Sequence, residues 1–354
     1  MIETEPLSFI VPGALSQLTG GYLFDRRVIE GLRASGRKVT VIELPGNFCE
    51  VDGEARSAAR TALAGLQDGA LVAIDGLALL AFDECLESEA ARLRVVIVVH
   101  HALADETGLD ERERRHIAAA EARLLATVRG VLCPSDNSAA AVAAYGVPSS
   151  SIAVTPPGTV KPVRLRRKRP HRGPLELLCV GTLTPRKGHR LLVEALDALA
   201  DRDWHCRCIG SLTRDPDTAA ATSYEIGRRG LKGRISLAGE WPPELMAKAY
   251  AAADAFVLPS YHEGYGMAFA EALAHGLPII ATTGGAIPQT VPRNAGLLVP
   301  PGDVVGLTSA LACLLDDAKL RAKLGAGARA AGAKLSDWPK AVACWAAALD
   351  RLSV

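Results

Sequence analysis

The sequence predicts an α/β protein with two doubly wound domains, each a parallel sheet covered by helices. Three observations support this fold class. Short apolar runs alternate with helical patterns along both halves of the 354 residues. The runs are almost continuously apolar, which is typical of parallel strands buried on both faces. A stretch rich in proline and arginine, residues 161–174, lies between the halves and is expected to be a linker.

The first half, residues 1–160, is expected to form the N-terminal Rossmann-like domain. Its predicted strands are Leu7–Val11, Lys38–Leu44, Leu71–Asp75, Val95–Val99, Gly130–Cys133 and Ser151–Val154. Its predicted helices are Tyr22–Ala34, Glu54–Leu66, Glu111–Thr127 and Asn137–Tyr145.

The second half, residues 175–336, repeats the alternation and is expected to form the C-terminal domain. Its predicted strands are Leu175–Val180, His205–Ile209, Ile235–Ala238, Ala255–Leu258, Pro278–Thr282 and Gly296–Val299. Its predicted helices are Arg190–Leu199, Thr218–Arg229, Pro243–Ala252, Met267–His275, Val304–Leu315 and Lys319–Ala331, and a last helix, Asp337–Leu352, follows after this pattern has closed. Ligands of such sheets bind beyond the carboxyl ends of the strands, so a cleft between the two domains is the expected site.

The composition excludes several classes of protein. Hydrophobic residues make up 49% of the chain and charged residues 22%, which excludes a disordered or fibrous chain. No uncharged apolar run reaches the length of roughly 18 residues that a spanning helix needs. The acidic start, Met1 to Glu5, is unlike a signal peptide, so a cytoplasmic location is expected.

Charge is distributed unevenly along the chain. Residues 1–160 carry a net charge of −7 and residues 161–354 a net charge of +8, and seven of the basic residues lie between Lys161 and Arg172. No nucleic-acid-binding motif accompanies this basic segment, so no nucleic-acid partner is expected. The segment could attract anionic lipid or substrate, but a solvated hinge is the plainer interpretation, and membrane association is not indicated.

The cysteines and acidic pairs do not predict a metal site. Eight cysteines, at positions 49, 85, 133, 179, 206, 208, 313 and 344, lack the spacing of a zinc or disulfide framework, and buried free thiols are expected. Two D-x-D pairs, Asp201 with Asp203 and Asp215 with Asp217, lie in turn-like sequence without the strand that such a motif follows. These spacings therefore do not predict a metal site.

A glycine-containing loop with two cations follows the strand that ends at Val180. The segment Gly181–His189 places Arg186, Lys187 and Gly188 between this strand and the next helix. Cations and helix-terminal amides at a strand's carboxyl end suit an anion such as a diphosphate. The loop lacks the spacing of a Walker A motif, and a solvated turn is the alternative interpretation.

The richest segment runs from Pro259 to Gly285, after the strand that ends at Leu258. Glu263 lies in a loop whose next residues are Gly264, Tyr265 and Gly266, and a helix is expected to open at Met267. Glu271 follows Glu263 with seven residues between them and lies about one turn into that helix. Free amides at a helix start bind phosphate and sugar oxygens, and carboxylates accept hydrogen bonds from sugar hydroxyls.

This segment resembles the E-x7-E signature of family 4 of the retaining glycosyltransferases, which have the GT-B fold. The Arg186–Lys187–Gly188 loop and an N-terminal loop, Thr19–Gly21, match the same family. The resemblance covers nearly the whole chain and is strongest from about residue 175 to residue 300. It implies two Rossmann-like domains facing a central cleft. It also implies that the last helix, within residues 337–354, crosses back to complete the first domain.

The resemblance implies roles for the donor-side residues. Glu271 would hold the ribose of the nucleotide, Glu263 the hydroxyls of the donor sugar, and Lys187 the diphosphate. Backbone amides would come from Gly264, Tyr265, Gly266 and Met267, while Gly20 and Gly21 would let the first domain approach the phosphates. Thr182 departs from the family, in which many members carry arginine at this position, and Arg186 would supply that charge instead.

Residues at strand ends of the first domain are candidates for the donor sugar and the acceptor. The resemblance implies that a histidine at the end of the strand Arg94–Val99 faces the donor sugar, and His100 fits this position, with His101 as the neighbour that hydrogen-bonds backbone or faces the acceptor. Glu106 lies in the following loop, which is expected to shape the acceptor pocket. Asp75 is a further acceptor-side candidate, with capping of the next helix as an equally good alternative.

The resemblance implies an enzyme that transfers a sugar from a nucleoside diphosphate sugar to a hydroxyl-bearing acceptor with retention. It implies His100, Lys187 and Glu263 as the catalytic residues, and it implies no metal and no cofactor. A UDP-sugar is the favoured donor and a GDP-sugar is possible, while the acceptor is an unknown small molecule, glycan or lipid-linked compound. The alternatives are a GT-B sugar-nucleotide epimerase or phosphorylase-like enzyme and a non-catalytic binder of nucleotide sugars.

Overall fold

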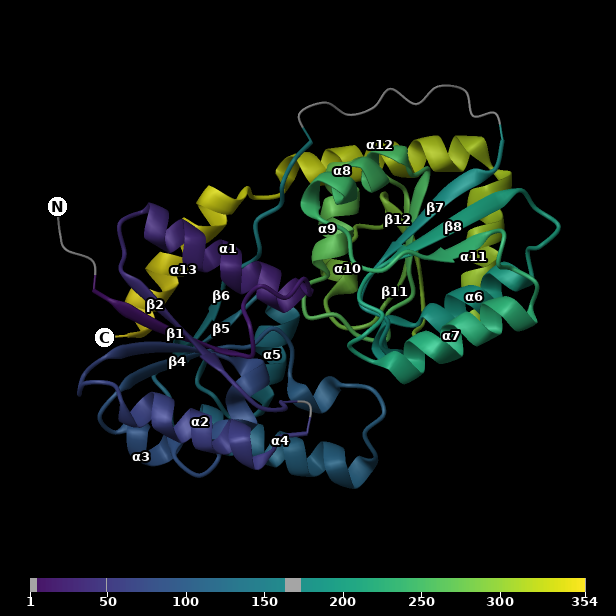
Figure 1. The fold of residues 1–354 in the computed structure, drawn as a ribbon. Helices are drawn as coiled ribbons and strands as arrows, with labels where there is room; N and C mark the ends of the chain where they lie inside the picture. Colours follow the sequence, from purple (N-terminus) through teal and green to yellow (C-terminus); the bar gives the residue numbers. More distant parts are fainter. Residues whose placement is uncertain (1–4, 49, 163–172, 354) are drawn as a thin grey trace. The chain divides into compact units, whose positions relative to one another are not determined.

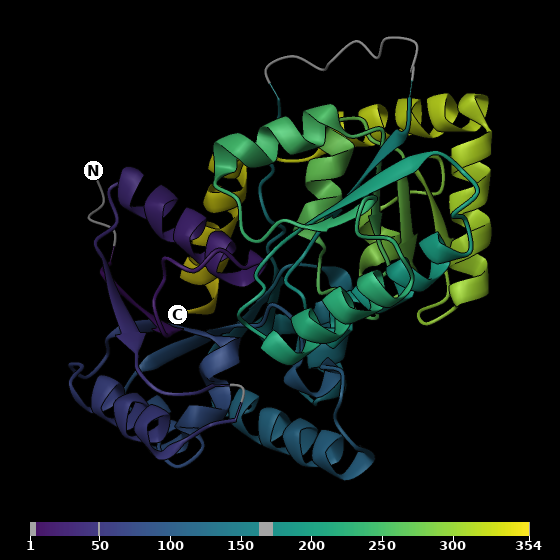
Figure 2. The ribbon, with the colours of Figure 1, turned by 45° about the vertical axis from the view of Figure 1, so that its right-hand side comes forward.

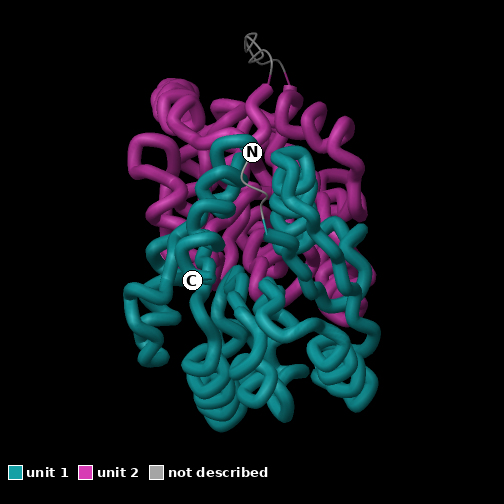
Figure 3. Tube along the Cα trace, turned by 90° about the vertical axis from the view of Figure 1, so that its left-hand side faces the viewer, with its two compact units in different colours: residues 1–158, 338–354 teal, residues 159–337 magenta. Residues whose placement is uncertain are grey.

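The computed structural model describes residues 5–48, 50–162 and 173–353, so Cys49 and most of the expected linker lie outside the described residues. The chain divides into two compact units, which Figure 3 shows in separate colours. Unit 1 comprises residues 1–158 and 338–354, and unit 2 comprises residues 159–337. The cleft expected between the two domains stays a prediction.

Unit 1 is built on a parallel sheet of six strands in the order β2-β1-β3-β4-β5-β6. The strands are β1 (Leu7–Pro12), β2 (Val39–Leu44), β3 (Leu71–Asp75), β4 (Arg94–Val98), β5 (Gly130–Cys133) and β6 (Ile152–Val154). Every residue of β3 and β5 is buried, as expected for central strands covered on both faces. The order reverses direction between β1 and β3, which makes this the switch point of the sheet.

Helices cover both faces of the unit 1 sheet (Figure 1). Helices α1 (Gly20–Ala34) and α13 (Trp338–Leu352) lie on one face. Helices α2 (Gly53–Ala64), α3 (Leu86–Ala90) and α4 (Glu111–Leu125) lie on the other, and α5 (Asp136–Ala144) connects β5 to β6. Short 3-10 turns, η1 (Gly76–Phe82), η2 (Leu103–Asp105) and η3 (Ser149–Ser151), connect these elements.

The last helix, α13, returns to unit 1 and packs on it closely. The ring of Trp345 stacks on Phe9 of β1 at 6.0 Å between centroids. A Cβ on Gly31 of α1 would lie 2.6 Å from Val342, and one on Gly130 of β5 would lie 2.9 Å from Leu352. These two glycines therefore set how closely α13 approaches, and the predicted return of the last helix to the first domain is confirmed.

Unit 2 is built on a second parallel sheet of six strands, in the order β12-β11-β10-β7-β8-β9. The strands are β7 (Leu175–Val180), β8 (Trp204–Ile209), β9 (Ile235–Leu237), β10 (Ala255–Leu258), β11 (Ile279–Thr282) and β12 (Gly296–Val299). Numbered within the unit, this is the strand order 3-2-1-4-5-6 of the dinucleotide-binding fold, with the switch point between β7 and β10.

The helices of unit 2 also form two layers (Figures 1 and 2). Helices α8 (Pro243–Ala252), α9 (Met267–Ala274) and α12 (Ala318–Lys334) lie on one face. Helices α6 (His189–Asp197), α7 (Pro216–Arg228) and α11 (Val304–Asp316) lie on the other, and the short elements are η4 (Pro185–Lys187) and α10 (Ile287–Thr290).

The twelve predicted strands are confirmed to within one residue at each end. Among the described residues, none of the helices combines the length and apolar content that crossing a bilayer requires. The expectation of buried thiols holds for Cys85, Cys133, Cys179, Cys206 and Cys208 and is wrong for Cys313 and Cys344, which are exposed on α11 and α13. The period of an amphipathic helix places those two positions on the polar face, although the residues around them are apolar.

Candidate functional site

The predicted donor-side residues of unit 2 lie at the switch point of its sheet. Lys187 follows β7 and Glu263 follows β10, and these two strands are neighbours in the sheet. Because parallel strands end at the same edge, loops that are 76 residues apart in sequence come together there. This is the place where open α/β sheets bind their ligands.

The loop after β7 is fixed by a tight turn at Gly188. This residue has a φ of +69°, in the left-handed region that favours glycine. A Cβ here would lie 2.2 Å from the carbonyl oxygen of Pro259, so only glycine lets the two loops approach this closely. The amide of Tyr261 donates to the carbonyl of Arg186 at 2.7 Å and ties the loops a second time.

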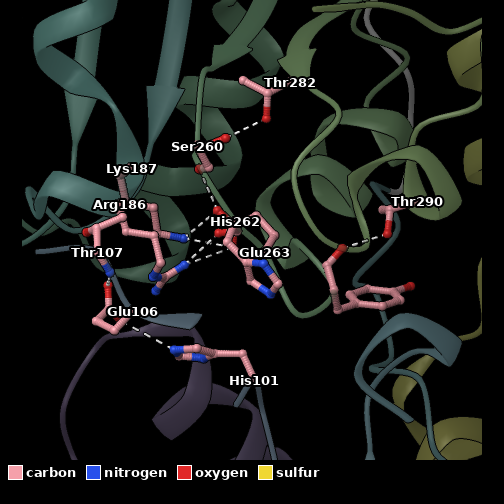
Figure 4. A network of polar contacts seen from close by, with 11 residues as sticks. His101, Glu106, Thr107, Arg186, Lys187, Ser260, His262, Glu263, Thr282 and Thr290 are labelled. Atoms are coloured by element: carbon pink, nitrogen blue, oxygen red, sulfur yellow. Dashed lines mark hydrogen bonds and ion pairs between the residues drawn. The ribbon is translucent and has the colours of Figure 1, made fainter. Parts of the chain in front are cut away.

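Glu263 is the centre of the polar cluster in unit 2 (Figure 4). The residue is 6% exposed, and Lys187 Nζ donates to Oε1 at 2.7 Å and to Oε2 at 2.9 Å. Ser260 Oγ donates to Oε1 at 2.6 Å. Arg186 Nη1 lies 3.7 Å from Oε2 and donates to the carbonyl of His262 at 2.8 Å. Arg186 therefore brings a second cation to the cluster.

The charges of this cluster keep Glu263 ionised. Burial disfavours the carboxylate, but the charges of Lys187 and Arg186 outweigh burial and lower the pKa of Glu263 to about 2. Glu263 is thus a permanent acceptor, and Lys187 is held in one position by two charge-assisted hydrogen bonds.

The loop after β11 packs against the backbone of Glu263 and its neighbours. The amide of Ala286 donates to the carbonyl of Glu263 at 2.8 Å. Gly285 has a φ of +58°, and a Cβ at Gly284 would lie 2.1 Å from the carbonyl oxygen of Tyr261. The two glycines that end the Pro259–Gly285 segment therefore allow this loop to pack against residues 261–263.

Helix α9 begins where the sequence predicts, directly after Gly266. Gly266 is its N-cap residue with a φ of +85°, and a Cβ there would lie 2.5 Å from the ring of Phe269. Gly264 is buried, Tyr265 is half-buried, and the carbonyl of Tyr265 accepts from Thr290 Oγ1 at 2.6 Å. Met267 opens the helix, so its amide is among those at the helix start that have no intrahelical acceptor.

Glu271 lies on α9, apart from the Lys187–Glu263 pair. Burial raises the pKa of its carboxyl, while the hydroxyl of Tyr250 opposes this by donating to it. The same Tyr250 hydroxyl lies 3.4 Å from the carbonyl oxygen of Ala268. Glu263 and Glu271 therefore differ in charge environment: cations surround the first, and a phenol contacts the second.

A second charged cluster lies at the switch point of the unit 1 sheet. His100 follows β4, Asp75 ends β3 and Asp25 lies in α1, the helix after β1. His100 Nε2 is 3.3 Å from Asp25 Oδ1 and 3.8 Å from Asp75 Oδ2. Neither Asp25 oxygen nor His100 Nε2 has a well-aligned hydrogen-bond partner in the described part of the chain.

Two carboxylates and one imidazole give this cluster unusual protonation. Burial lowers the pKa of His100, but the negative charges of Asp25 and Asp75 outweigh burial and raise it to about 9. Burial and the charge of Asp25 raise the pKa of Asp75 to about 7. One oxygen or nitrogen atom from each of the three groups lies within 4.8 Å of the others, but an imidazolium at His100 has no lone pair to offer a metal ion.

The other residues predicted in unit 1 surround His100 or follow it. A Cβ on Gly21 would lie 3.3 Å from the His100 ring, whereas one on Gly20 would meet open space. His101 Nε2 lies 3.3 Å from Glu106 Oε2, so the structure brings these two acceptor-side candidates together. Asp75 Oδ1 accepts from the amide of Leu77 at 2.8 Å, which is the capping role weighed as its alternative.

Asp25 and Ser260 are site residues that the sequence analysis missed. Asp25 is fully buried on the apolar face of α1, between Phe24 and Val28. A lone charge within an apolar helical stripe is the signal that could have found it. Ser260 gives no comparable signal, because a serine after a strand is common in turns.

Part of the chain is similar in sequence to known glycosyltransferases. Residues 174–317 match the family "Glycosyl transferases group 1". The chain is 35% identical over 154 residues to a D-inositol 3-phosphate glycosyltransferase of Corynebacterium glutamicum, covering 41% of this chain and 36% of that protein. A GDP-mannose-dependent monoacylated alpha-(1-6)-phosphatidylinositol monomannoside mannosyltransferase of the same species is 33% identical over 163 residues, which is 44% of this chain and 41% of the relative. The matches thus span less than half of these two relatives.

Solved structures match nearly the whole chain in fold. Sucrose-phosphate synthase from Thermosynechococcus elongatus has a TM-score of 0.79 at 22% identity, covering 96% of this chain and 97% of the other. HepE of Anabaena, solved with UDP and glucose, has a TM-score of 0.73 at 19% identity, covering 98% of this chain and all of the other. Identities this low show the fold alone. The chain therefore has the two-domain GT-B fold, and its residues 174–317 match the glycosyl transferases group 1 family, in agreement with the resemblance to family 4 glycosyltransferases.

Proposed function

We propose that this protein transfers a sugar from a nucleoside diphosphate sugar to a hydroxyl of its acceptor, with retention of the anomeric configuration. Similarity to glycosyltransferases over residues 174–317 supports the general activity. One relative is named for GDP-mannose, and one structural neighbour was solved with UDP and glucose. UDP-sugars remain our first choice of donor, with GDP-sugars as the alternative.

The Lys187–Glu263 pair is the observation that carries this proposal. An ionised carboxylate has about four acceptor positions, two on each oxygen. Lys187 and Ser260 occupy both positions on Oε1, while Oε2 accepts only from Lys187 among the hydrogen bonds of the described residues. One position on Oε2 is left for a donor such as a sugar hydroxyl. The cation that would bind the diphosphate and the acceptor that would bind the sugar are thus fixed next to each other.

The cations of unit 2 would stabilise the leaving group. As the bond between the sugar and the diphosphate breaks, negative charge develops on the phosphate oxygens. Lys187, Arg186 and the first amides of α9 are fixed before the reaction, so they stabilise this charge without reorganising. In the mechanism that the resemblance implies, the acceptor hydroxyl attacks on the face from which the diphosphate departs, and the leaving phosphate takes the hydroxyl proton.

Glu271 is proposed to bind the ribose. Its carboxyl accepts from Tyr250, and its other acceptor positions suit the two adjacent ribose hydroxyls. The proposed roles of His100 toward the donor sugar, and of His101, Asp75 and Glu106 toward the acceptor, rest on the resemblance and on the strand ends where these residues lie. No metal takes part in the proposed reaction.

A panel of nucleotides tests the donor assignment. UDP or a UDP-sugar should raise the melting temperature of the protein more than NAD does, because the phosphate loop lacks a dinucleotide fingerprint. Stronger stabilisation by GDP than by UDP would change only the base assigned to the donor. Stabilisation by NAD that equals or exceeds that of all the diphosphates would overturn the proposal.

The Glu271→Gln variant tests the ribose contact, and donor turnover tests catalysis. Loss of a charged hydrogen bond should weaken nucleotide binding by roughly 1.5–3 kcal/mol. Transfer to an acceptor, or slow hydrolysis of the donor, distinguishes an enzyme from a non-catalytic binder. Binding without either reaction, with a broad panel of acceptors, would favour the binder.

A further inference from the structure

Four side chains that the proposed reaction does not use come together in the core of unit 2. Cys179 is the next-to-last residue of β7, and Cys208 is the next-to-last residue of β8. These two cysteines are direct partners in the parallel register, so their side chains lie on the same face of the sheet. Cys206 lies two residues before Cys208 and shares that face.

His189 reaches the same face from the helix above. It is the first residue of α6 and follows the left-handed turn at Gly188. The side chain is 2% exposed, and neither of its ring nitrogens has a hydrogen-bond partner among the described residues. A buried imidazole with two unsatisfied nitrogens is costly, which points to a group that the protein chain alone does not supply.

The geometry fits a metal ion. One ring nitrogen of His189 and the sulfur atoms of Cys179 and Cys208 all lie within 4.8 Å of one another. Thiolate and imidazole ligands select zinc or a similar soft divalent ion over magnesium or calcium, which need oxygen ligands. Two thiolates and a neutral imidazole also cancel the charge of a divalent ion, so the complex is neutral within an apolar core.

Zinc binds cysteine as the thiolate, so Cys179 and Cys208 would each lose a proton when the ion binds. The metal-binding group comprises Cys179, His189 and Cys208, and it does not include Cys206.

We propose that Cys179, His189 and Cys208 bind one zinc ion. The site would join β7, β8 and α6, the three elements around the loop that carries Arg186 and Lys187. It is a structural site by its closed surroundings, since all three ligands are buried. The proposal departs from the absence of a metal expected from cysteine spacing, because the ligands come from three separate elements.

The test measures zinc in the purified, reduced full-length chain. After removal of metal with a chelator and exposure to a small excess of zinc, the protein should retain one zinc per chain through desalting. Cobalt in place of zinc should give the intense visible bands of a tetrahedral thiolate site. Removing the metal should lower the melting temperature, and restoring it should reverse the change.

Variants identify the ligands. Cys179→Ser, Cys208→Ser and His189→Gln should each lose tight zinc binding. Cys133→Ser is the matched control, because Cys133 is equally buried but lies in unit 1. Zinc retention that is unchanged in the ligand variants would overturn the proposal, and so would the absence of zinc and cobalt binding by the folded parent chain. If the reduced chain binds no metal and the oxidised chain contains a Cys179–Cys208 disulfide, the zinc proposal is wrong and the two cysteines form a redox pair instead. None of these outcomes depends on the sugar-transfer activity.

Discussion

The charged clusters of unit 1 and unit 2 occupy the same place in their sheets but differ in how their charges are compensated. Each lies at the switch point where strand order reverses, beyond the carboxyl ends of parallel strands. In unit 2, two cations and a hydroxyl surround one carboxylate, and the pKa of Glu263 falls to about 2. In unit 1, two carboxylates share one imidazole, and the pKa values of Asp75 and His100 rise to about 7 and 9.

This difference indicates what each cluster can do. The unit 2 cluster keeps the same charge over the whole neutral range, which suits a site for an anion of fixed charge. The unit 1 cluster can exchange a proton near neutral pH, because the midpoint for Asp75 lies there. A positively charged His100 can donate hydrogen bonds to neutral hydroxyls. A carboxyl that titrates near pH 7 can also take part in proton transfer.

The largest expected effect is on the stability of unit 2 after Lys187→Met. This change leaves the buried carboxylate of Glu263 without its main partner, and breaking a buried pair in this way costs about 3 kcal/mol or more. Denaturant unfolding measures the loss, and Lys248→Met on the exposed face of α8 is the matched control. The double variant Lys187→Met/Glu263→Gln should recover most of the stability. Equal stability of Lys187→Met and Lys248→Met would contradict the account of this pair.

The next effect concerns the pH dependence of unit 1. The folded-state pKa values of Asp75 and His100 lie above the ordinary values of 3.8 and 6.5 for these side chains. Both groups therefore bind protons more tightly in the folded chain, and their contribution to stability falls as the pH rises from about 4 to 9. Glu263 acts in the opposite sense, because its stabilisation is lost only as the pH falls from about 4.5 towards 2.

Asp75→Asn should remove the part of the pH dependence of stability that Asp75 contributes. One group contributes up to about 1.4 kcal/mol per pH unit between its two pKa values. Hydrogen exchange of β3 and β4, compared at about pH 5 and about pH 8, reports the stability of this region alone. The exposed Asp68→Asn variant should retain the slope of the parent chain. If the Asp75→Asn chain also retains it, Asp75 does not titrate near pH 7.

A smaller effect is the titration of His100 itself. Its imidazole signals in an NMR titration should have a midpoint near 9 in the parent chain. Asp25→Asn should lower this midpoint more than Asp75→Asn does, because Asp25 is the nearer carboxylate. A midpoint that does not change in the Asp25→Asn chain would exclude the proposed pairing.

The sequence predicts the strands of both units because their apolar runs are short, continuous and separated by clear turns. It also predicts Lys187, Glu263 and Glu271 as residues near strand ends and a helix start. It could not predict that Lys187 pairs with Glu263, since this depends on β7 and β10 being neighbours in the folded sheet. Asp25 and the thiol–imidazole cluster were missed for the same reason: the groups that contact them come from other strands and helices.

Calorimetry with UDP and GDP tests the central claim that the unit 2 cluster binds the donor diphosphate. The variants to compare are Lys187→Met/Glu263→Gln, Glu263→Gln alone and His100→Gln. Loss of a charged hydrogen bond predicts about 10-fold to 100-fold weaker binding when Lys187 is removed. Glu263→Gln should bind the bare nucleotide at least as tightly as the parent, because Lys187 no longer pairs with a carboxylate, and His100→Gln should bind it unchanged. Unchanged affinity without Lys187, together with lost affinity without His100, would contradict the account.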